Sequence, residues 1–318
     1  MIKVSLERAA EAAVKTCLGV KGGENFLVIT DTEKEAIGRA LFKAGLDVGA
    51  DALLVVMKPR TRHGEEPPKP IAEMWAHCDA FLAPTKFSLT HTQARKKAID
   101  AGARGATMPG VTEEMFLETM GIDYAKVKKY CERMKKVLDG AKEIRIKSAL
   151  GTNLTVSIKG RTPIMDTGIL HRKGDFGNLP AGEIFVAPVE GSANGRIVFD
   201  GSVAGVGILT EPMRVEVKDG YAVNITGGGA GQIKKLLEPA GKEAYNIAEA
   251  GVGCNFGAKI VGNILEDEKV YKTAHIALGD SSTIGGKVKA GVHLDGLVKR
   301  PIFIVDGKEI IKDGNWLV

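Results

Sequence analysis

Histidine and acidic residues near the carboxyl end of the chain have the types and spacing of metal ligands. His293 and Asp295 are two residues apart in Val292–Asp295, and His275 lies in the apolar segment Thr273–Gly279. Residues two apart in a strand face the same side, so His293 and Asp295 can both point at one ion. Imidazole nitrogen with carboxylate oxygen is the usual ligand set of zinc, manganese, cobalt and iron. Any one such histidine is more often structural, and it is their combination that indicates a metal site.

Two glutamates stand in unusually apolar surroundings. Glu183 follows a Pro-Ala-Gly turn and leads into Ile184–Pro188, while Glu249 ends a predicted helix, Gln232–Ala248, and precedes a glycine-rich segment. A buried carboxylate costs several kcal/mol unless it is paired, protonated or bound to a metal. We therefore expect Glu183 and Glu249 to join the metal site.

These segments resemble those of the aminopeptidase T family of thermophilic metallo-aminopeptidases, whose superfamily also includes 2,5-dihydroxypyridine dioxygenases. Asn178–Pro188 is similar to the family's Asn-hydrophobe-Pro segment, which ends in a metal-binding glutamate, an aromatic residue and Ala-Pro. The resemblance covers the second half of the chain and, more weakly, the first. The positions that match the family's metal ligands are Glu183, Glu249, His275, His293 and Asp295.

The resemblance implies a hydrolase that cleaves N-terminal residues from peptides with a water activated by two divalent metal ions, zinc, cobalt or manganese. In this hypothesis Glu249 bridges the two ions. The resemblance also implies a homodimer, since members of the family form homodimers. Glu268, in the acidic group Glu266–Glu268, is the expected sixth metal-site residue and proton shuttle. The alternative interpretation of Glu268, a solvated carboxylate at a strand end, has equal weight.

One departure from the family leaves two other functions open. The segment Asp280–Gly286 lacks the tyrosine that stabilises the oxyanion in the peptidases, unless a serine or lysine within residues 281–289 replaces it. The main alternative is a ring-cleaving dioxygenase of the 2,5-dihydroxypyridine type, with one iron on His275, His293 and Asp295. A binding module without turnover is the third hypothesis. Because Glu183 and Glu249 are retained, the aminopeptidase is the main expectation.

The helices and strands expected to position these residues differ between the two halves of the chain. Residues 1–140 alternate strand-like runs (Phe26–Thr30, Ala52–Met57, Ala80–Ala83) with helical patterns, which predicts an α/β domain with a parallel sheet and flanking helices. Residues 141–318 are rich in short alternating strands and glycine, which predicts an α+β, sheet-rich, metal-binding catalytic domain. The glycine cluster Gly227–Gly231 lacks the spacing of a nucleotide-binding loop and is interpreted as a turn, so no organic cofactor is predicted.

Composition narrows the function further. The chain of 318 residues carries a net charge of +5, but its lysines and arginines are scattered, so we expect no nucleic-acid partner. Its four cysteines are far apart and have no metal-ligand spacing. Glu7 and Glu11 within Met1–Leu18 indicate an amphipathic helix in place of a signal peptide. With no run long enough to span a membrane, we expect no membrane partner and a cytoplasmic protein.

Overall fold

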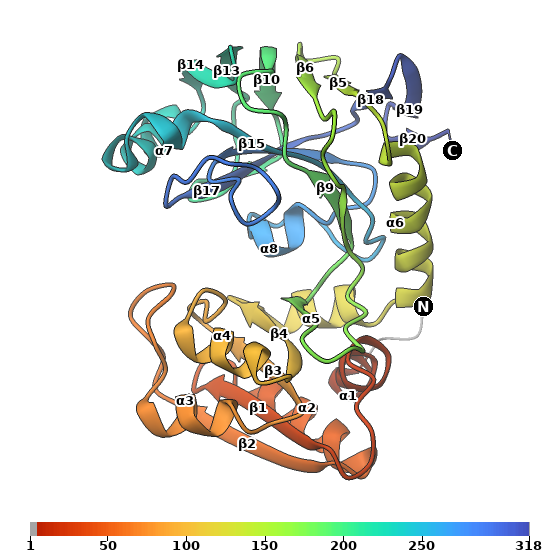
Figure 1. Cartoon of the computed structure of the whole chain (residues 1–318), viewed down its shortest axis with the longest axis vertical. Coiled ribbons are helices and arrows are strands. Elements are labelled where there is room, and N and C mark those ends of the chain that lie inside the picture. The colour runs from red at the N-terminus through yellow and green to blue at the C-terminus, as the bar shows by residue number, and fades with distance from the viewer. Residues whose placement is uncertain (1–4, 318) are drawn as a thin grey trace. The chain divides into compact units, whose positions relative to one another are not determined.

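The computed structural model describes residues 5–317, which form two compact units (Figure 1). Of the described residues, one unit comprises 5–128 with Asp166–Ala181, and the other comprises Lys129–Met165 with 182–317. The boundary predicted between residues 140 and 141 stays a prediction. The helix predicted at Met1–Leu18 is seen from α1 (Leu6–Glu11), which continues into a π-helical turn, η1 (Ala12–Cys17); residues 1–4 lie outside the described part.

The first unit contains a five-stranded parallel sheet in the order β2-β1-β3-β4-β8. Its strands are β1 (Asn25–Asp31), β2 (Asp51–Met57), β3 (Ala80–Thr85), β4 (Arg104–Pro109) and β8 (Phe176–Asn178). The helices are α2 (Glu35–Asp47), α3 (Lys69–Trp75), α4 (Gln93–Asp100) and α5 (Glu113–Met120), and α6 (Tyr124–Leu138) leads to the second unit. The predicted parallel sheet with flanking helices is confirmed.

Local sequence explains these elements. The apolar runs of β1 and β3 are buried along almost their whole length, as expected for parallel strands covered on both faces. Thr92 and Thr112 begin α4 and α5, since each hydroxyl accepts a hydrogen bond from a backbone N–H in the first helical turn. Trp75 and Phe81 pack edge to face in the core, with ring centroids 5.0 Å apart.

The second unit contains two mainly antiparallel sheets. The eight-stranded sheet has the order β14-β13-β10-β6-β5-β18-β19-β20 and the seven-stranded sheet the order β12-β11-β17-β16-β15-β9-β7. The strands of the first are β5 (Glu143–Lys147), β6 (Asn153–Ser157), β10 (Asn194–Phe199), β13 (Met213–Lys218), β14 (Tyr221–Gly227), β18 (Ile302–Val305), β19 (Lys308–Lys312) and β20 (Asn315–Trp316). Those of the second are β7 (Ile164–Asp166), β9 (Glu183–Val186), β11 (Ser202–Val203), β12 (Gly207–Ile208), β15 (Ile247–Gly253), β16 (Ala274–Gly279) and β17 (His293–Val298). The sheet-rich character predicted for this part of the chain is confirmed.

The predicted helix Gln232–Ala248 is wrong over its second half. Helix α7 (Ala230–Leu237) is followed by two 3₁₀ turns, η2 (Glu238–Ala240) and η3 (Lys242–Tyr245), and then by β15. Pro239 has no N–H for a helical hydrogen bond, and Gly241 has a φ of 78° that turns the chain out of the helix. Glu249 therefore lies within a buried strand and does not end a helix.

The two sheets of the second unit pack face to face. Gly296 of β17 lies against the ring of Phe199 of β10, so that a Cβ atom at position 296 would stand 2.6 Å from the ring. Figure 1 shows the short helix α8 (Ile264–Asp267) on the other side of the seven-stranded sheet. One face of this sheet is thus part of the core, while the other is free to carry functional groups.

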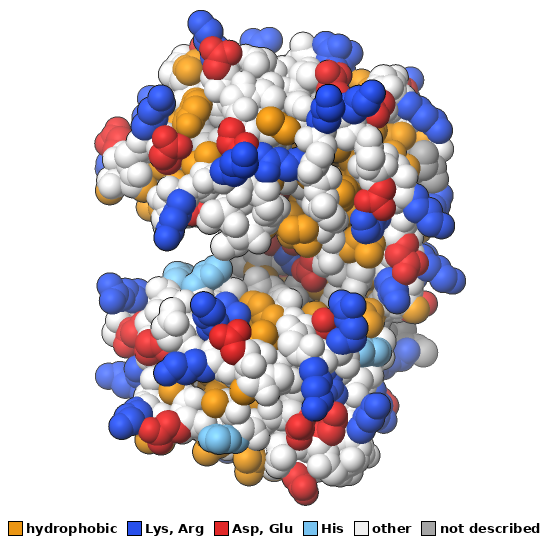
Figure 2. Space-filling model, viewed as in Figure 1, with side chains coloured by type: hydrophobic (Ala, Val, Ile, Leu, Met, Phe, Trp, Pro, Cys, Tyr) orange, Lys and Arg blue, Asp and Glu red, His pale blue; other side chains and the backbone are white. Residues whose placement is uncertain are grey.

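Surface charge follows the scattered pattern of the sequence. On the face drawn in Figure 2, lysine and arginine side chains lie dispersed among aspartate and glutamate. Within residues 5–317, no helix is long and apolar enough to cross a membrane. The predicted absence of nucleic-acid and membrane partners stays a prediction.

Gly296→Ala is expected to destabilise the second unit by about 1–3 kcal/mol, because the added methyl group forces Phe199 from its place between the sheets. Urea unfolding measures the loss. In a Phe199→Leu background, which removes the ring, the same substitution should cost much less. Equal losses in both backgrounds would show that the close packing of Gly296 on Phe199 does not limit stability.

Candidate metal centre

The predicted ligands project from one face of the seven-stranded sheet. In the strand register Glu249 pairs with Ala277, and Ala277 pairs with Asp295. Directly paired residues in antiparallel strands share a face, and so do residues two apart in one strand. The pairs Gly251 with His275, Gly279 with His293, and Gly253 with Glu183 extend the same face. The sheet therefore brings all five predicted ligands together, although they come from four strands.

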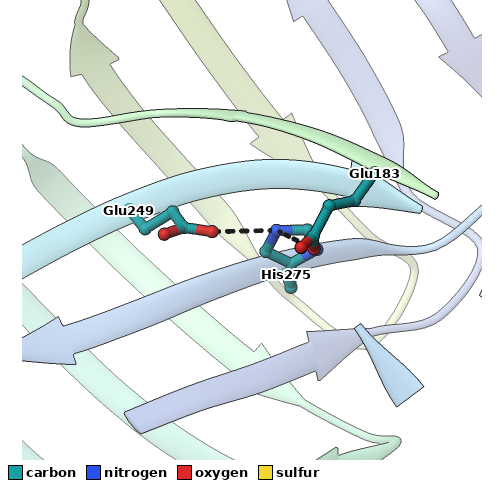
Figure 3. A group of neighbouring side chains, drawn as sticks. All are labelled: Glu183, Glu249 and His275. Atoms are coloured by element: carbon teal, nitrogen blue, oxygen red, sulfur yellow. Dashed lines mark hydrogen bonds and ion pairs between the residues drawn. The ribbon is translucent and has the colours of Figure 1, made fainter. Parts of the chain in front are cut away.

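Glu249 lies between the two histidines. Its Oε1 is 3.1 Å from His275 Nε2, and its Oε2 is 3.4 Å from His293 Nε2. His275 Nε2 is also 3.5 Å from Glu183 Oε2 (Figure 3), and His293 Nε2 is 3.4 Å from Asp295 Oδ2. The ligand atoms form two groups, Glu183 with Glu249 and His275, and Glu249 with His293 and Asp295, each within 4.8 Å of one another. Glu249 is common to both groups.

Burial leaves carboxylate oxygens of this cluster without donors. His275 is fully buried, and Glu183, Glu249 and Asp295 are each 6% exposed. Glu183 Oε2 and Asp295 Oδ1 are buried and accept no hydrogen bond. Such oxygens are costly to bury unless a cation offsets their charge. The donor set, imidazole nitrogens with carboxylate oxygens, fits a divalent transition-metal ion.

The loop before β17 fixes the orientation of His293. Its Nδ1 donates a hydrogen bond to the Asp280 carbonyl at 2.8 Å, so Nε2 faces the carboxylates. The Asp280 side chain in turn accepts hydrogen bonds from the backbone N–H groups of Ser282 and Ala290. This is the arrangement in which metal-binding histidines are usually held by a second layer of contacts. Ser281, a predicted replacement for the missing tyrosine, is engaged in the same loop, where its hydroxyl accepts from Val288 N–H.

The cluster shifts the pKa of its members in opposite directions. Burial alone would raise the pKa of Glu249, but hydrogen bonds and positive charge from His275 and His293 outweigh it and lower that pKa. Burial alone would lower the pKa of His275, but the hydrogen bond to Glu249 and the nearby carboxylates raise it to about 9. The nearby carboxylates thus favour the protonated form of both histidines when no ion is bound.

Small residues make room on this face. A Cβ atom on Gly251 would lie 2.1 Å from His275 Nε2, so the imidazole lies directly over the glycine. A Cβ atom on Gly253 would lie 2.1 Å from the Val270 carbonyl oxygen, so the chain segment after α8 crosses the sheet at that point. Ala277 separates Glu249 from Asp295. Larger side chains at these positions would fill the space in which the ligands meet.

The structure places Glu268 beside the cluster but outside both ligand groups. Its carboxylate forms an ion pair with Lys269, which also reaches Glu183 at 3.0 Å. Burial raises the pKa of Glu268, against the opposing charge of Lys269. Lys269, only 2% exposed, was missed by the sequence analysis. The available signal was a lysine directly after three acidic residues and ahead of a candidate ligand histidine.

Solved structures of other proteins share this fold. The structure is similar to 2,5-dihydroxypyridine dioxygenase from Pseudomonas putida, with a TM-score of 0.83, 17% identity and coverage of 100% of this chain and 98% of that one. It is also similar to wild-type AmpT from Thermus thermophilus, with a TM-score of 0.72, 19% identity and coverage of 98% and 99%. At these identities the likeness shows a common fold.

A family model described as 2,5-dihydroxypyridine 5,6-dioxygenase (NicX) matches residues 5–318, and the chain belongs to this family. The chain is also 23% identical over 201 residues to the 2,5-dihydroxypyridine 5,6-dioxygenase of Pseudomonas putida, a match that spans 56% of this chain and about half, 55%, of the relative. The predicted superfamily is confirmed, and the family implies a metal cofactor.

The expected assignment as an aminopeptidase is wrong. The match to the dioxygenase family model contradicts this assignment. The predicted descriptions hydrolase, metallopeptidase and protease are wrong for the same reason. The error has a physical reason, since histidine and carboxylate ligands are used both by hydrolytic metal sites and by non-haem iron oxygenases and do not distinguish the two reactions. The missing tyrosine in Asp280–Gly286 was the feature that favoured the dioxygenase.

The metal-free protein is expected to lose stability as the pH rises. The pKa of His275, raised from 6.5 to about 9, makes its contribution fully present below pH 6.5 and lost as the pH passes 9. The expected loss is about 3 kcal/mol at most. Thermal unfolding in chelator between pH 6 and 10 measures it, with His275→Gln as the comparison in which this component disappears. An equal pH dependence in both proteins would contradict the assignment.

Gly251→Ala is expected to weaken metal binding at least about tenfold, because the methyl group displaces the His275 ring from the ligand face. Calorimetric titration with Mn²⁺ measures the affinity. Gly231→Ala in α7 is the matched control, since no atom lies within 4 Å of its added Cβ. The control should keep the wild-type affinity. If Gly251→Ala also keeps it, His275 does not contribute to the ion site.

Proposed function

We propose that this chain is a non-haem iron dioxygenase that opens the ring of a dihydroxypyridine. The observation that carries the proposal is the dioxygenase family match over residues 5–318, which includes every residue of the buried ligand cluster. Nitrogen and oxygen ligands of this kind suit iron as well as zinc or manganese. The homodimer and the cytoplasmic location predicted from the sequence stay predictions.

The chain's own residues supply the binding site and its charge. The triad predicted for the dioxygenase, His275, His293 and Asp295, would hold the ion. Glu249, which lies 3.1 Å from His275 and 3.4 Å from His293, is a further ligand candidate. When bound, iron supplies the one-electron chemistry by which molecular oxygen reacts with an electron-rich ring. His293, whose side chain is 33% exposed, marks the accessible side of the cluster, whereas His275 marks the closed side. We therefore expect substrate to approach from the His293 side.

Oxygen consumption tests the proposal directly. Metal-free protein is reconstituted with Fe²⁺ without oxygen and then given 2,5-dihydroxypyridine and oxygen. We expect loss of the substrate's absorbance together with uptake of one O₂ per ring opened. His293→Ala and Asp295→Asn should lower the rate at least about 100-fold through loss of the ion, and Gly231→Ala should not.

Two controls separate failure of the proposal from failure of the preparation. Iron content measured on the same sample establishes that the centre is loaded, and circular dichroism establishes that the variants are folded. Iron-loaded, folded wild-type protein that consumes no oxygen with 2,5-dihydroxypyridine or its ring isomers would overturn the proposed function.

A further inference from the structure

The loop between β16 and β17 leads directly to His293. It spans Asp280–Val292, and two of its glycines, Gly285 and Gly291, have positive φ angles of 92° and 70°. Glycine loses more backbone freedom on folding than any other residue, so such a loop is costly to hold in one conformation. The orientation of the His293 ring depends on this loop, because its Nδ1 donates a hydrogen bond to the Asp280 carbonyl at 2.8 Å.

An ion pair from outside the loop holds the tip of the loop. Arg161 Nη2 lies 2.5 Å from Glu190 Oε2, and Arg161 Nη1 donates a hydrogen bond to the Gly285 carbonyl. Glu190 Oε1 accepts a hydrogen bond from Lys287 N–H at 2.7 Å. Each partner therefore uses one atom for the ion pair and another atom for the loop.

The ion pair is itself fixed by neighbouring backbone. Arg161 Nη2 also donates to the Pro188 carbonyl at 3.4 Å, and Val189 N–H donates to the Ser157 carbonyl at 2.8 Å, which joins the connections that follow β6 and β9. The side chain of Arg161 is 12% exposed and that of Glu190 is 30% exposed. An arginine that shares its donors between a carboxylate and two carbonyls is held more firmly than one in an exposed ion pair.

Hydrogen bonds inside the loop connect its tip to its base. Ser281 N–H donates to the Val288 carbonyl at 2.9 Å, and Val288 N–H donates to the Ser281 hydroxyl at 3.3 Å. At the base, the Asp280 carboxylate accepts a hydrogen bond from Ala290 N–H at 2.9 Å. These contacts end at the Asp280 carbonyl, which is the acceptor of His293 Nδ1.

We propose that Arg161 and Glu190 are positioning residues of the candidate metal centre. By holding residues 285–287 they fix the loop, and through the Asp280 carbonyl they fix the direction in which His293 Nε2 faces the ion. Neither residue belongs to the two groups of candidate ligands. The inference rests on the proposed function only in that His293 binds a metal ion.

Metal affinity measured in a double-mutant cycle tests the inference without substrate or oxygen. Metal-free protein is titrated with Co²⁺ by calorimetry. Arg161→Met removes the charge and the donors, and it should weaken Co²⁺ binding about tenfold, because the His293 ring is no longer held in place. In a His293→Ala background the same substitution should change the affinity less than about twofold, since no ring is left to position. The visible absorption spectrum of bound Co²⁺ in Arg161→Met should shift toward that of His293→Ala.

Two comparisons show whether the effect is specific to this ion pair. Lys312→Met removes one partner of the ion pair with Glu309, whose side chains are 55% and 42% exposed, and it should keep the wild-type affinity. Glu190→Gln keeps a side-chain oxygen that can accept the Lys287 N–H, so it should lose less affinity than Glu190→Ala.

Several outcomes overturn the inference. Unchanged affinity in Arg161→Met would show that the loop needs no external support, and an equal loss in both backgrounds would show that Arg161 does not act through His293. Wild-type affinity in His293→Ala would remove the ligand on which the inference depends. If circular dichroism shows that Arg161→Met does not fold, the cycle is repeated with Glu190→Ala, and failure of both variants to fold would assign the pair to stability alone.

The proposed function fails separately. Coupling between Arg161 and His293 in the metal titration, together with no ring cleavage by the iron-loaded protein, contradicts the dioxygenase but not the positioning role. Ring cleavage without that coupling contradicts only the positioning role.

Discussion

Buried negative charge is the constraint on which the second unit depends. Glu183, Glu249 and Asp295 share one face of a sheet and are almost inaccessible to water, so their charges cannot be screened. In the metal-free protein His275, His293 and Lys269 offset them through a chain of ion pairs. A bound divalent ion would replace part of this compensation, and the histidines would then lose their protons to act as ligands. Metal binding and protonation are therefore linked in this centre.

The two faces of the seven-stranded sheet differ in character, and the buried carboxylates lie on only one of them. Along β15 and β16 the residues on the core side are apolar, among them Ala250, Val252 and Ile276, while those on the other side are ligands, glycine or alanine. Glycine is usually unfavourable in a strand because it has no side chain to pack. Here Gly251 gives its space to the His275 ring, and Gly253 gives its space to the chain that carries Lys269. The glycines that are unfavourable for the strand are therefore the residues that leave room for the candidate ligands to approach one another.

Part of the candidate metal site can be predicted from the sequence, whereas the remaining contacts depend on pairing between strands that are far apart in the chain. Strand alternation was enough to place His293 and Asp295 on one side of one strand, because the period of two is local. Glu249 was assigned to a helix end because Gln232–Ala248 was interpreted as one helix, and the break at Pro239 and Gly241 was missed. Lys269 was missed because its contact with Glu183 joins residues that are far apart in sequence.

The pattern of candidate ligands in the sequence was not sufficient to predict which reaction the protein catalyses. A cluster of histidine and carboxylate groups fixes which ions can bind, whereas the reaction depends on which redox state the ion can adopt and on what stands around it. Zinc has no redox chemistry, so a hydrolytic centre gains from two ions that share a water, while a single iron suffices to react with oxygen.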